Sequence, residues 1–105
     1  MWTILAGQTI QMVDGDYGLE LPIMINGVTL GGSDEIMLKI ARGNDVLIEK
    51  TYGNISDNKV NPVLSEAETA LLPVGNYCWG LDWYRDGVFM CNVVARNGFK
   101  VVDKL

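Results

Sequence analysis

Turn-forming residue pairs interrupt this chain at short intervals and limit each regular element to a few residues. They combine glycine with asparagine, aspartate or a second glycine, residues that adopt the positive φ angles of tight turns at little cost. Long helices cannot form between turns spaced this closely, so the spacing predicts strands joined by hairpins. The pairs are Asp14-Gly15, Asn26-Gly27, Gly31-Gly32, Gly43-Asn44, Asp86-Gly87 and Asn97-Gly98.

The segments between these turns have the length and composition of β-strands. In residues 19–25 an aliphatic side chain occupies every second position, which places one face of that strand against a core. Seven to eight short strands at this spacing predict an all-β, antiparallel β-sandwich, and 105 residues suffice for one domain, 1–105. The expected strands are Gln8–Val13, Tyr17–Ile25, Glu35–Ala41, Val46–Tyr52, Lys59–Leu64, Tyr77–Tyr84, Val88–Ala95 and Phe99–Val102.

One short helical turn is expected near residues 65–72. Ser65 and Glu68 stand at capping-box spacing, where each side chain satisfies a backbone N–H that the first helical turn leaves unpaired. Pro73 cannot continue the helix. Residues 70–72 would then close one end of the sandwich, as helical crossings between sheets do in immunoglobulin-like domains.

The middle hairpin has a register that suits both faces of the sheet. A three-residue loop of Gly43, Asn44 and Asp45 sets Ile40 opposite Ile48 on the inner face. The same loop sets Lys39 opposite Glu49 on the outer face, so an apolar pair points inward and a charge pair outward.

Two loops in the C-terminal third share one pattern, Arg85-Asp86-Gly87 and Arg96-Asn97-Gly98. Each fits a three-residue hairpin loop in which the glycine forms a bulge. This register predicts a fully apolar core face on the last three strands. The expected pairs are Trp83 with Phe89, Leu81 with Cys91 and Trp79 with Val93, and Phe99 and Val101 continue the row beside Ala95 and Val93.

The same register makes the outer face of these strands unusually apolar. Such a face on a soluble domain marks a contact with another chain, or it is covered by the N-terminal strand or a loop of the same chain. Both alternatives stay open at this point, and the first predicts a subunit interface. The outer face gathers Tyr84, Val88, Met90, Val94 and Val102 around Asp82, Asn92 and Lys100.

The residue types argue against catalysis and bound metal. The chain has no histidine, which removes the commonest general base, the commonest neutral metal ligand and the base of Ser-His and Cys-His nucleophile systems. Asp82 is expected on the outer face without a partner carboxylate in a cleft. Asp14-Gly15-Asp16 lacks the remaining ligands of a calcium loop. No catalytic residue, metal ligand or cofactor is therefore predicted.

The two cysteines are expected to be reduced thiols. Strand parity places Cys78 and Cys91 on opposite faces and out of cross-strand alignment, which disulfide geometry does not tolerate. Cys91 is expected as a small core residue and Cys78 as a half-covered surface residue. This agrees with folding in a reducing cytoplasm.

Charge and hydropathy exclude two classes of partner. Eight lysines and arginines against thirteen acidic residues give a net charge of -5, and the cations are scattered along the chain, so nucleic acid is not an expected partner. No apolar run is long enough to span a membrane. The first residues lack the basic segment of a secretory signal, so export by that route is not expected.

Three segments together resemble a known family. They are VDGDYGLELPIMING, DEIMLKIARGNDVLIEK and LSEAETALLPVGNYCWGLDWYRDG. In order and character they resemble the N-terminal immunoglobulin-like domain of tailed-phage baseplate upper proteins and related small phage and prophage virion modules. Gly15-Asp16 precedes an alternating strand, residues 36–40 lie in a hairpin, and residues 64–81 lead into the last strands, as in that family.

The resemblance implies an immunoglobulin-like fold and a structural, non-enzymatic role in a baseplate, tail or head decoration. The partners would be other virion subunits or further copies of the chain, and the protein would be made in the host bacterial cytoplasm. The alternative is a carbohydrate- or receptor-binding module. In that case exposed tyrosines, Tyr17, Tyr52 or Tyr84, would stack on the ligand.

Overall fold

The computed structural model describes residues 3–4, 9–16, 23–25 and 27–103. They form short and long strands and one helical turn, so the predicted all-β class is confirmed. The elements are β1 Thr3–Ile4, β2 Ile10–Val13, β3 Ile23–Met24, β4 Asp34–Arg42, β5 Asp45–Tyr52, β6 Lys59–Val60, α1 Glu66–Thr69, β7 Gly75–Arg85 and β8 Val88–Val102.

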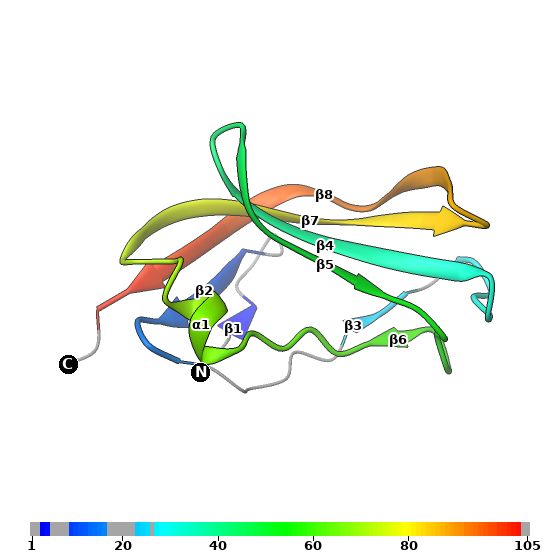
Figure 1. Ribbon diagram of the computed structural model, residues 1–105, viewed down its shortest axis with the longest axis horizontal. Coiled ribbons are helices and arrows are strands. Elements are labelled where there is room, and N and C mark those ends of the chain that lie inside the picture. The colour runs from blue at the N-terminus through cyan, green and yellow to red at the C-terminus, as the bar shows by residue number, and fades with distance from the viewer. Residues whose placement is uncertain (1–2, 5–8, 17–22, 26, 104–105) are drawn as a thin grey trace.

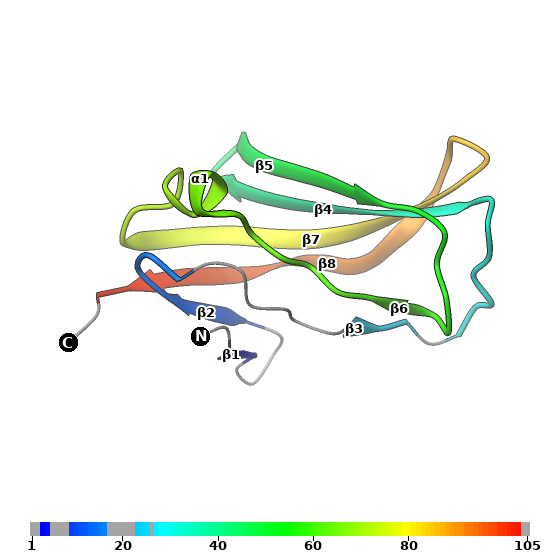
Figure 2. The same ribbon diagram turned by 60° about the horizontal axis from the view of Figure 1, so that its bottom comes forward.

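A curled sheet of six strands dominates the molecule, in the order β1-β2-β8-β7-β4-β5 (Figures 1 and 2). The pair β3–β6 forms a second, smaller layer, which gives a sandwich-like arrangement. The strands pair antiparallel except β2 and β8, which run parallel, with Ile10 opposite Phe99 and Met12 opposite Val101. No hairpin joins β2 to β8, so their direction is set by matching of buried side chains rather than by a turn.

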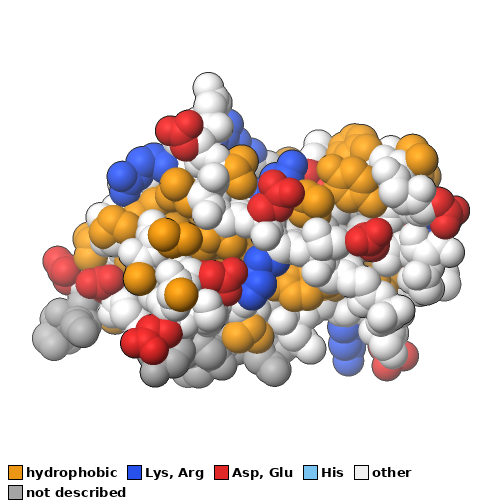
Figure 3. Space-filling view, in the orientation of Figure 1, with side chains coloured by type: hydrophobic (Ala, Val, Ile, Leu, Met, Phe, Trp, Pro, Cys, Tyr) orange, Lys and Arg blue, Asp and Glu red, His pale blue; other side chains and the backbone are white. Residues whose placement is uncertain are grey.

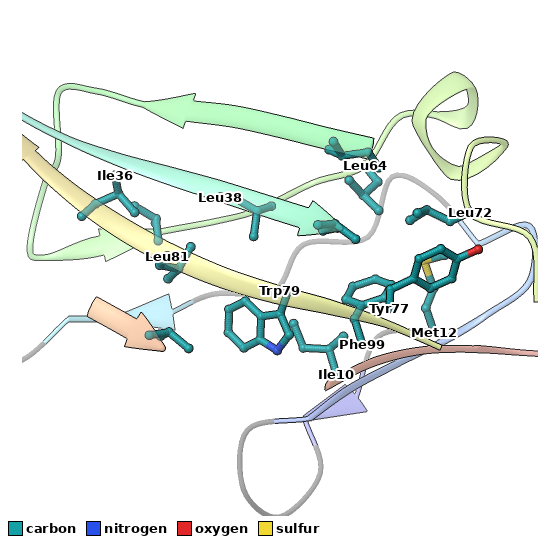
Figure 4. Packing of buried hydrophobic residues seen from close by; sticks show 14 of the residues in the cluster. Ile10, Met12, Ile36, Leu38, Leu64, Leu72, Tyr77, Trp79, Leu81 and Phe99 are labelled. Carbon is teal, nitrogen blue, oxygen red and sulfur yellow. The ribbon is translucent and has the colours of Figure 1, made fainter. Parts of the chain in front are cut away.

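The core lies between the inner face of the large sheet and the segment that runs from β6 through α1 (Figure 4). Side chains of β4 alternate between buried and more exposed positions, the period-two pattern expected of a strand with one covered face. Leu64 and Leu72 flank α1 and are fully buried, and the rings of Tyr77 and Phe99 meet edge to face with centroids 6.5 Å apart.

The capping box at the start of α1 is present as predicted. Ser65 Oγ accepts from the backbone N–H of Glu68 at 3.1 Å, and Glu68 Oε1 accepts from the backbone N–H of Ser65 at 2.9 Å. Partial burial opposes ionisation of Glu68, but the hydrogen bond from Ser65 and the Lys50 ammonium lower its pKa below the ordinary value. Of residues 70–72 only Leu72 closes the core, because a single turn buries one face and leaves Leu71 exposed.

The β4–β5 hairpin has the predicted pairs but not the predicted loop. Ile40 lies opposite Ile48 and Lys39 opposite Glu49. The turn contains two residues rather than three, and a bulge beside Ile40 restores the register. Gly43 has φ 60°, as the first position of a type II′ turn requires, and such turns match the twist of paired strands.

The predicted pairing of β7 with β8 is wrong. Asp86 and Gly87 form a two-residue turn with φ 53° and 77°, the pattern of a type I′ turn. Three register shifts follow along the hairpin, so Tyr84 lies opposite Phe89, Trp83 opposite Cys91 and Leu81 opposite Val94. As a result Phe89 and Cys91 are exposed, and the buried residue beside Leu81 is Val94.

The predicted hairpin loop at Arg96-Asn97-Gly98 does not exist. Strand β8 continues for 15 residues, and Gly98 pairs with Cys78 inside the ladder. A Cβ added at Gly98 would lie 3.2 Å from Cγ2 of Thr9. The glycine therefore permits close packing of the segment before β2 and does not form the predicted turn.

The small layer is held by one asparagine rather than by long strands. Of the expected strand Tyr17–Ile25, residues 17–22 lie outside the described residues, and the described part forms the two-residue strand β3. Of the expected strand Lys59–Leu64, only β6 is a strand. Asn58 has φ 55°, and its amide donates to the carbonyls of Ile25 at 3.0 Å and Val28 at 2.5 Å. Its Oδ1 accepts from the backbone N–H of Leu30 at 2.9 Å, so three bonds tie the segment after β3 to the turn before β6.

Candidate functional site

The turn end of the β7–β8 hairpin is anchored by a buried carboxylate at the start of β4. Asp34 is 3% exposed, and its Oδ1 accepts from Trp83 Nε1 and from Arg85 Nε, each at 2.8 Å. The backbone N–H of Gly31 donates to Oδ2 at 2.8 Å. These bonds join the start of β4 to the preceding loop and to the end of β7, so the turn end of the β7–β8 hairpin is fixed in place.

The same contacts keep Asp34 ionised. Hydrogen bonds from Arg85 and Trp83, with the charge of the guanidinium, hold the pKa of Asp34 well below its ordinary value of 3.8 although burial acts in the opposite direction. The guanidinium of Arg85 also lies over the Trp83 ring at 5.0 Å. The acid and its partners act as a structural clamp.

Three successive apolar side chains are exposed beyond this clamp. Val88 is 61% exposed, Phe89 51% and Met90 44%. The Phe89 ring meets the half-buried Tyr84 ring at 72° with centroids 5.6 Å apart. We call Tyr84, Val88, Phe89 and Met90 the hairpin patch, and Figure 3 shows hydrophobic side chains gathered over this end of the molecule.

The hairpin patch lies beside an open stretch of strand edge. Strand β2 pairs with β8 only from Phe99 to Val102, so among the described strands residues 88–98 of β8 have a ladder on the β7 side alone. The register shifts make this edge irregular, and irregular edges resist addition of a further strand. A partner would therefore bind this end of the β7–β8 hairpin through its side chains more than through its backbone groups.

The predicted partner-contact residues are only partly together. Tyr84, Val88 and Met90 lie in the hairpin patch. Val94 is 9% exposed and belongs to the core, which corrects its predicted place on the outer face. Val102 is half-buried at the far end of β8, beside β2. The register shifts explain the burial of Val94, because they alter which β8 side chains face outward. Val102 lies far from the hairpin patch because β8 continues through residues 96–98 instead of turning back.

Phe89 is the patch residue that the sequence interpretation missed. It was expected in the core opposite Trp83, but it lies opposite Tyr84 and faces outward. The signal that identifies it is Asp86-Gly87, a dipeptide strongly preferred in two-residue type I′ turns. A two-residue turn at this position pairs Tyr84 with Phe89, whereas a three-residue loop pairs Trp83 with Phe89.

The tyrosines of the alternative carbohydrate site do not form one platform. Tyr17 lies outside the described residues. Tyr52 is opposite Ile36 and packs against the core, and burial raises the pKa of its hydroxyl. Tyr84 is opposite Glu35 on the other face of the sheet. Tyr52 and Tyr84 therefore offer no shared stacking surface.

A groove of about 270 Å³ crosses the outer face of β4, β7 and β8, under the tip of the β4–β5 hairpin. At one end Asp82 Oδ1 accepts from Asn92 Nδ2 at 2.5 Å, and Lys39 Nζ lies 3.6 Å from Asp82 Oδ2. At the other end Arg96 donates to the Gly43 carbonyl and, through Nε, to Cys78 Sγ at 3.0 Å. We call this feature the outer-face groove.

Both cysteines are free, as predicted. Cys78 is half-buried at the outer-face groove, where its Sγ also donates to the Ala41 carbonyl at 3.4 Å. Cys91 is exposed, which corrects the prediction that it belongs to the core. The shift of register next to Trp83 places it opposite Trp83, where it lines an open cavity with Ile25 and Val28.

The segment Asp14-Gly15-Asp16 forms a tight turn in which Gly15 has φ 86° and the Asp16 N–H donates to the Val13 carbonyl at 3.0 Å. Among the described residues no three His, Cys, Asp or Glu side chains are grouped to hold a metal ion. Within the same part of the chain no helix is long and apolar enough to cross a membrane.

Comparison of the chain with protein-family models, with curated proteins and with solved structures finds no match. The candidate sites therefore depend on the geometry of the described residues alone.

Proposed function

We propose that this protein is a non-enzymatic structural module that docks through the hairpin patch onto a neighbouring subunit of a phage or prophage virion. The observation that carries the proposal is the run of Val88, Phe89 and Met90, each roughly half exposed at the end of a hairpin that the Asp34 clamp holds rigid. A rigid apolar element binds a partner without losing further conformational freedom.

The free energy gained by burying the hairpin patch is that of one part of a larger interface. Full burial of one such side chain contributes about 1.5–3 kcal/mol, so covering the exposed halves of three contributes about 2–4 kcal/mol. Binding energy at interfaces is concentrated in a few well-packed residues, and aromatic side chains are frequent among them. Phe89 with its Tyr84 contact is the expected centre, and Met90 adapts to the partner surface.

The virion context is supported by the resemblance of residues 13–27, 34–50 and 64–87 to small immunoglobulin-like modules of phage particles. The absence of histidine from the sequence supports a binding rather than a catalytic role. Baseplate, tail and head decoration are all compatible with such a module. Its partners would be other virion subunits or further copies of the chain.

A paired set of double variants tests the proposal. Phe89→Lys with Met90→Lys places two charges in the hairpin patch, whereas Leu71→Lys with Val74→Lys places them at apolar residues that are 55% and 44% exposed elsewhere. Particles purified from cells that carry the gene are analysed for the chain by mass spectrometry, and the isolated chain by light scattering. We expect the patch variant to be lost from particles, or to dissociate an oligomer, while the control behaves as wild type.

Two results contradict this function. Equal incorporation of the patch variant and the control shows that the hairpin patch is not the docking surface. Complete absence of the wild-type chain from particles shows that it is not a virion component.

A further inference from the structure

We propose that the outer-face groove is a binding site for a single saccharide unit that carries a carboxylate, such as a uronic acid. The groove lies on the same sheet face as the hairpin patch but is lined by different residues, so this site is independent of the assembly role. Its volume of about 270 Å³ is near the lower limit of small-molecule sites, about 300–1,000 Å³, and suits one sugar ring rather than a chain.

Gly80 lines the groove and adds no side chain to its floor. Gly80 lies at the centre of β7, and a Cβ there would be 3.0 Å from the Val94 carbonyl oxygen. The tip of the β4–β5 hairpin forms one wall, where Val46 is 50% exposed. An apolar wall beside a bare backbone floor offers contact to the C–H groups of a sugar ring.

One end of the groove combines hydrogen-bond donors and acceptors in the way that hydroxyl groups require. The Asp82 carboxylate accepts from Asn92 at 2.5 Å and lies 3.6 Å from the Lys39 ammonium. A carboxylate only accepts and an ammonium only donates. A ligand hydroxyl donates and accepts at once, so neighbouring sugar hydroxyls satisfy Asp82 and Lys39 together.

The other end holds a fixed guanidinium. Bonds from Arg96 to the Gly43 carbonyl and to Cys78 Sγ use two of its five donors and orient the group across the groove. The planar fork of arginine matches the two oxygens of a carboxylate. Among the side chains that line the groove, Lys39 and Arg96 exceed Asp82 by one positive charge, and Glu49, opposite Lys39 on β5, does not line it, so the groove offers an anion a local site in a chain whose net charge is -5.

The placement of Asp82 favours an acidic sugar over an acidic peptide. An aspartate or glutamate side chain brings only acceptor oxygens, and a second carboxylate near Asp82 would be repelled. A uronic acid ring brings one carboxylate for Arg96 and hydroxyls for the Asp82 end.

Matched ligands test this assignment on the whole chain. Methyl glycosides of galacturonic, glucuronic and mannuronic acid are titrated beside the neutral glycosides of galactose, glucose and mannose, with acetyl-Glu-Glu as the peptide probe, and binding is followed by amide chemical shifts. We expect at least one uronide to bind at least tenfold more tightly than its neutral counterpart and than the dipeptide. Failure of every uronide to do so overturns the proposal.

Variants at exposed residues locate the site. Arg96→Ala and Asn92→Ala should each weaken uronide binding at least fivefold, and Lys100→Ala, which removes an exposed cation of the same strand outside the groove, should leave it unchanged. Equal weakening by Lys100→Ala shows general attraction of an anion and overturns the site. Circular dichroism confirms that each variant is folded.

Discussion

Asn58 holds the small layer together through its side chain and its backbone conformation, and its replacement separates these two contributions. Asn58→Gly removes three side-chain hydrogen bonds but keeps the φ of 55° without steric cost. Asn58→Ala removes the same bonds and also places a Cβ in the left-handed region. Asn58→Asp keeps an acceptor for the Leu30 N–H but turns a carboxylate oxygen toward two carbonyls.

The expected losses follow from the bonds. Each hydrogen bond contributes about 0.5–1.5 kcal/mol net, so Asn58→Gly should lower the free energy of unfolding by about 3 kcal/mol. Asn58→Ala should cost about 1–2 kcal/mol more, because left-handed backbone is unfavourable for alanine. Asn58→Asp should be at least as harmful as Asn58→Gly at neutral pH. Losses of this size are a large part of a total stability of about 5–15 kcal/mol.

Urea unfolding followed by tryptophan fluorescence measures these differences, since Trp79 is 3% exposed in the folded chain. The matched control is Asn54→Gly, because Asn54 also has a positive φ, 49°, but is exposed. A loss at Asn58→Gly within about 0.5 kcal/mol of the control would refute the idea that the side-chain bonds hold the small layer.

Two further predictions concern the large sheet. The pKa of Asp34 is lowered in the folded state, so its ion pair with Arg85 stabilises the fold above pH 3.8 and that stability is lost as the pH falls below this value. The wild-type unfolding midpoint should therefore fall steeply in acid, and Asp34→Asn should flatten that part of the curve; an unchanged slope contradicts the clamp. Gly80→Ala should cost about 1–3 kcal/mol, because the added carbon meets the Val94 backbone oxygen at 3.0 Å. Gly98→Ala meets a side chain that can rotate and should cost less, and the reverse order in urea unfolding contradicts this reasoning.

Features governed by neighbouring residues could be predicted from the sequence. The Ser65–Glu68 capping box depends on a spacing of three residues, and the structure contains both of its bonds. The Ile40–Ile48 pair depends on keeping apolar side chains on one face, and it forms even though the loop beside it is shorter than expected. In both cases residues close together in the sequence are sufficient to determine the contact.

Features that depend on distant contacts could not be predicted in the same way. Gly98 resembles a turn residue, but it faces the side chain of Thr9, which comes from another part of the chain and leaves little space for a Cβ. The register shifts along β8 move Phe89 outward and Val94 inward, and no simple alternation encodes them. The outer-face groove likewise combines Lys39, Asp82 and Arg96 only because β4 and β8 flank β7.

The parallel pairing of β2 with β8 has a mechanical consequence. These strands lie near opposite ends of the described chain and run in the same direction through four residue pairs. Tension applied between residues 9 and 103 would load the hydrogen bonds of this ladder in shear, all at once, instead of opening them one after another. A module with this strand arrangement carries a pull between those residues through the four pairs of β2 with β8, so the β7–β8 hairpin end lies outside the path of the force.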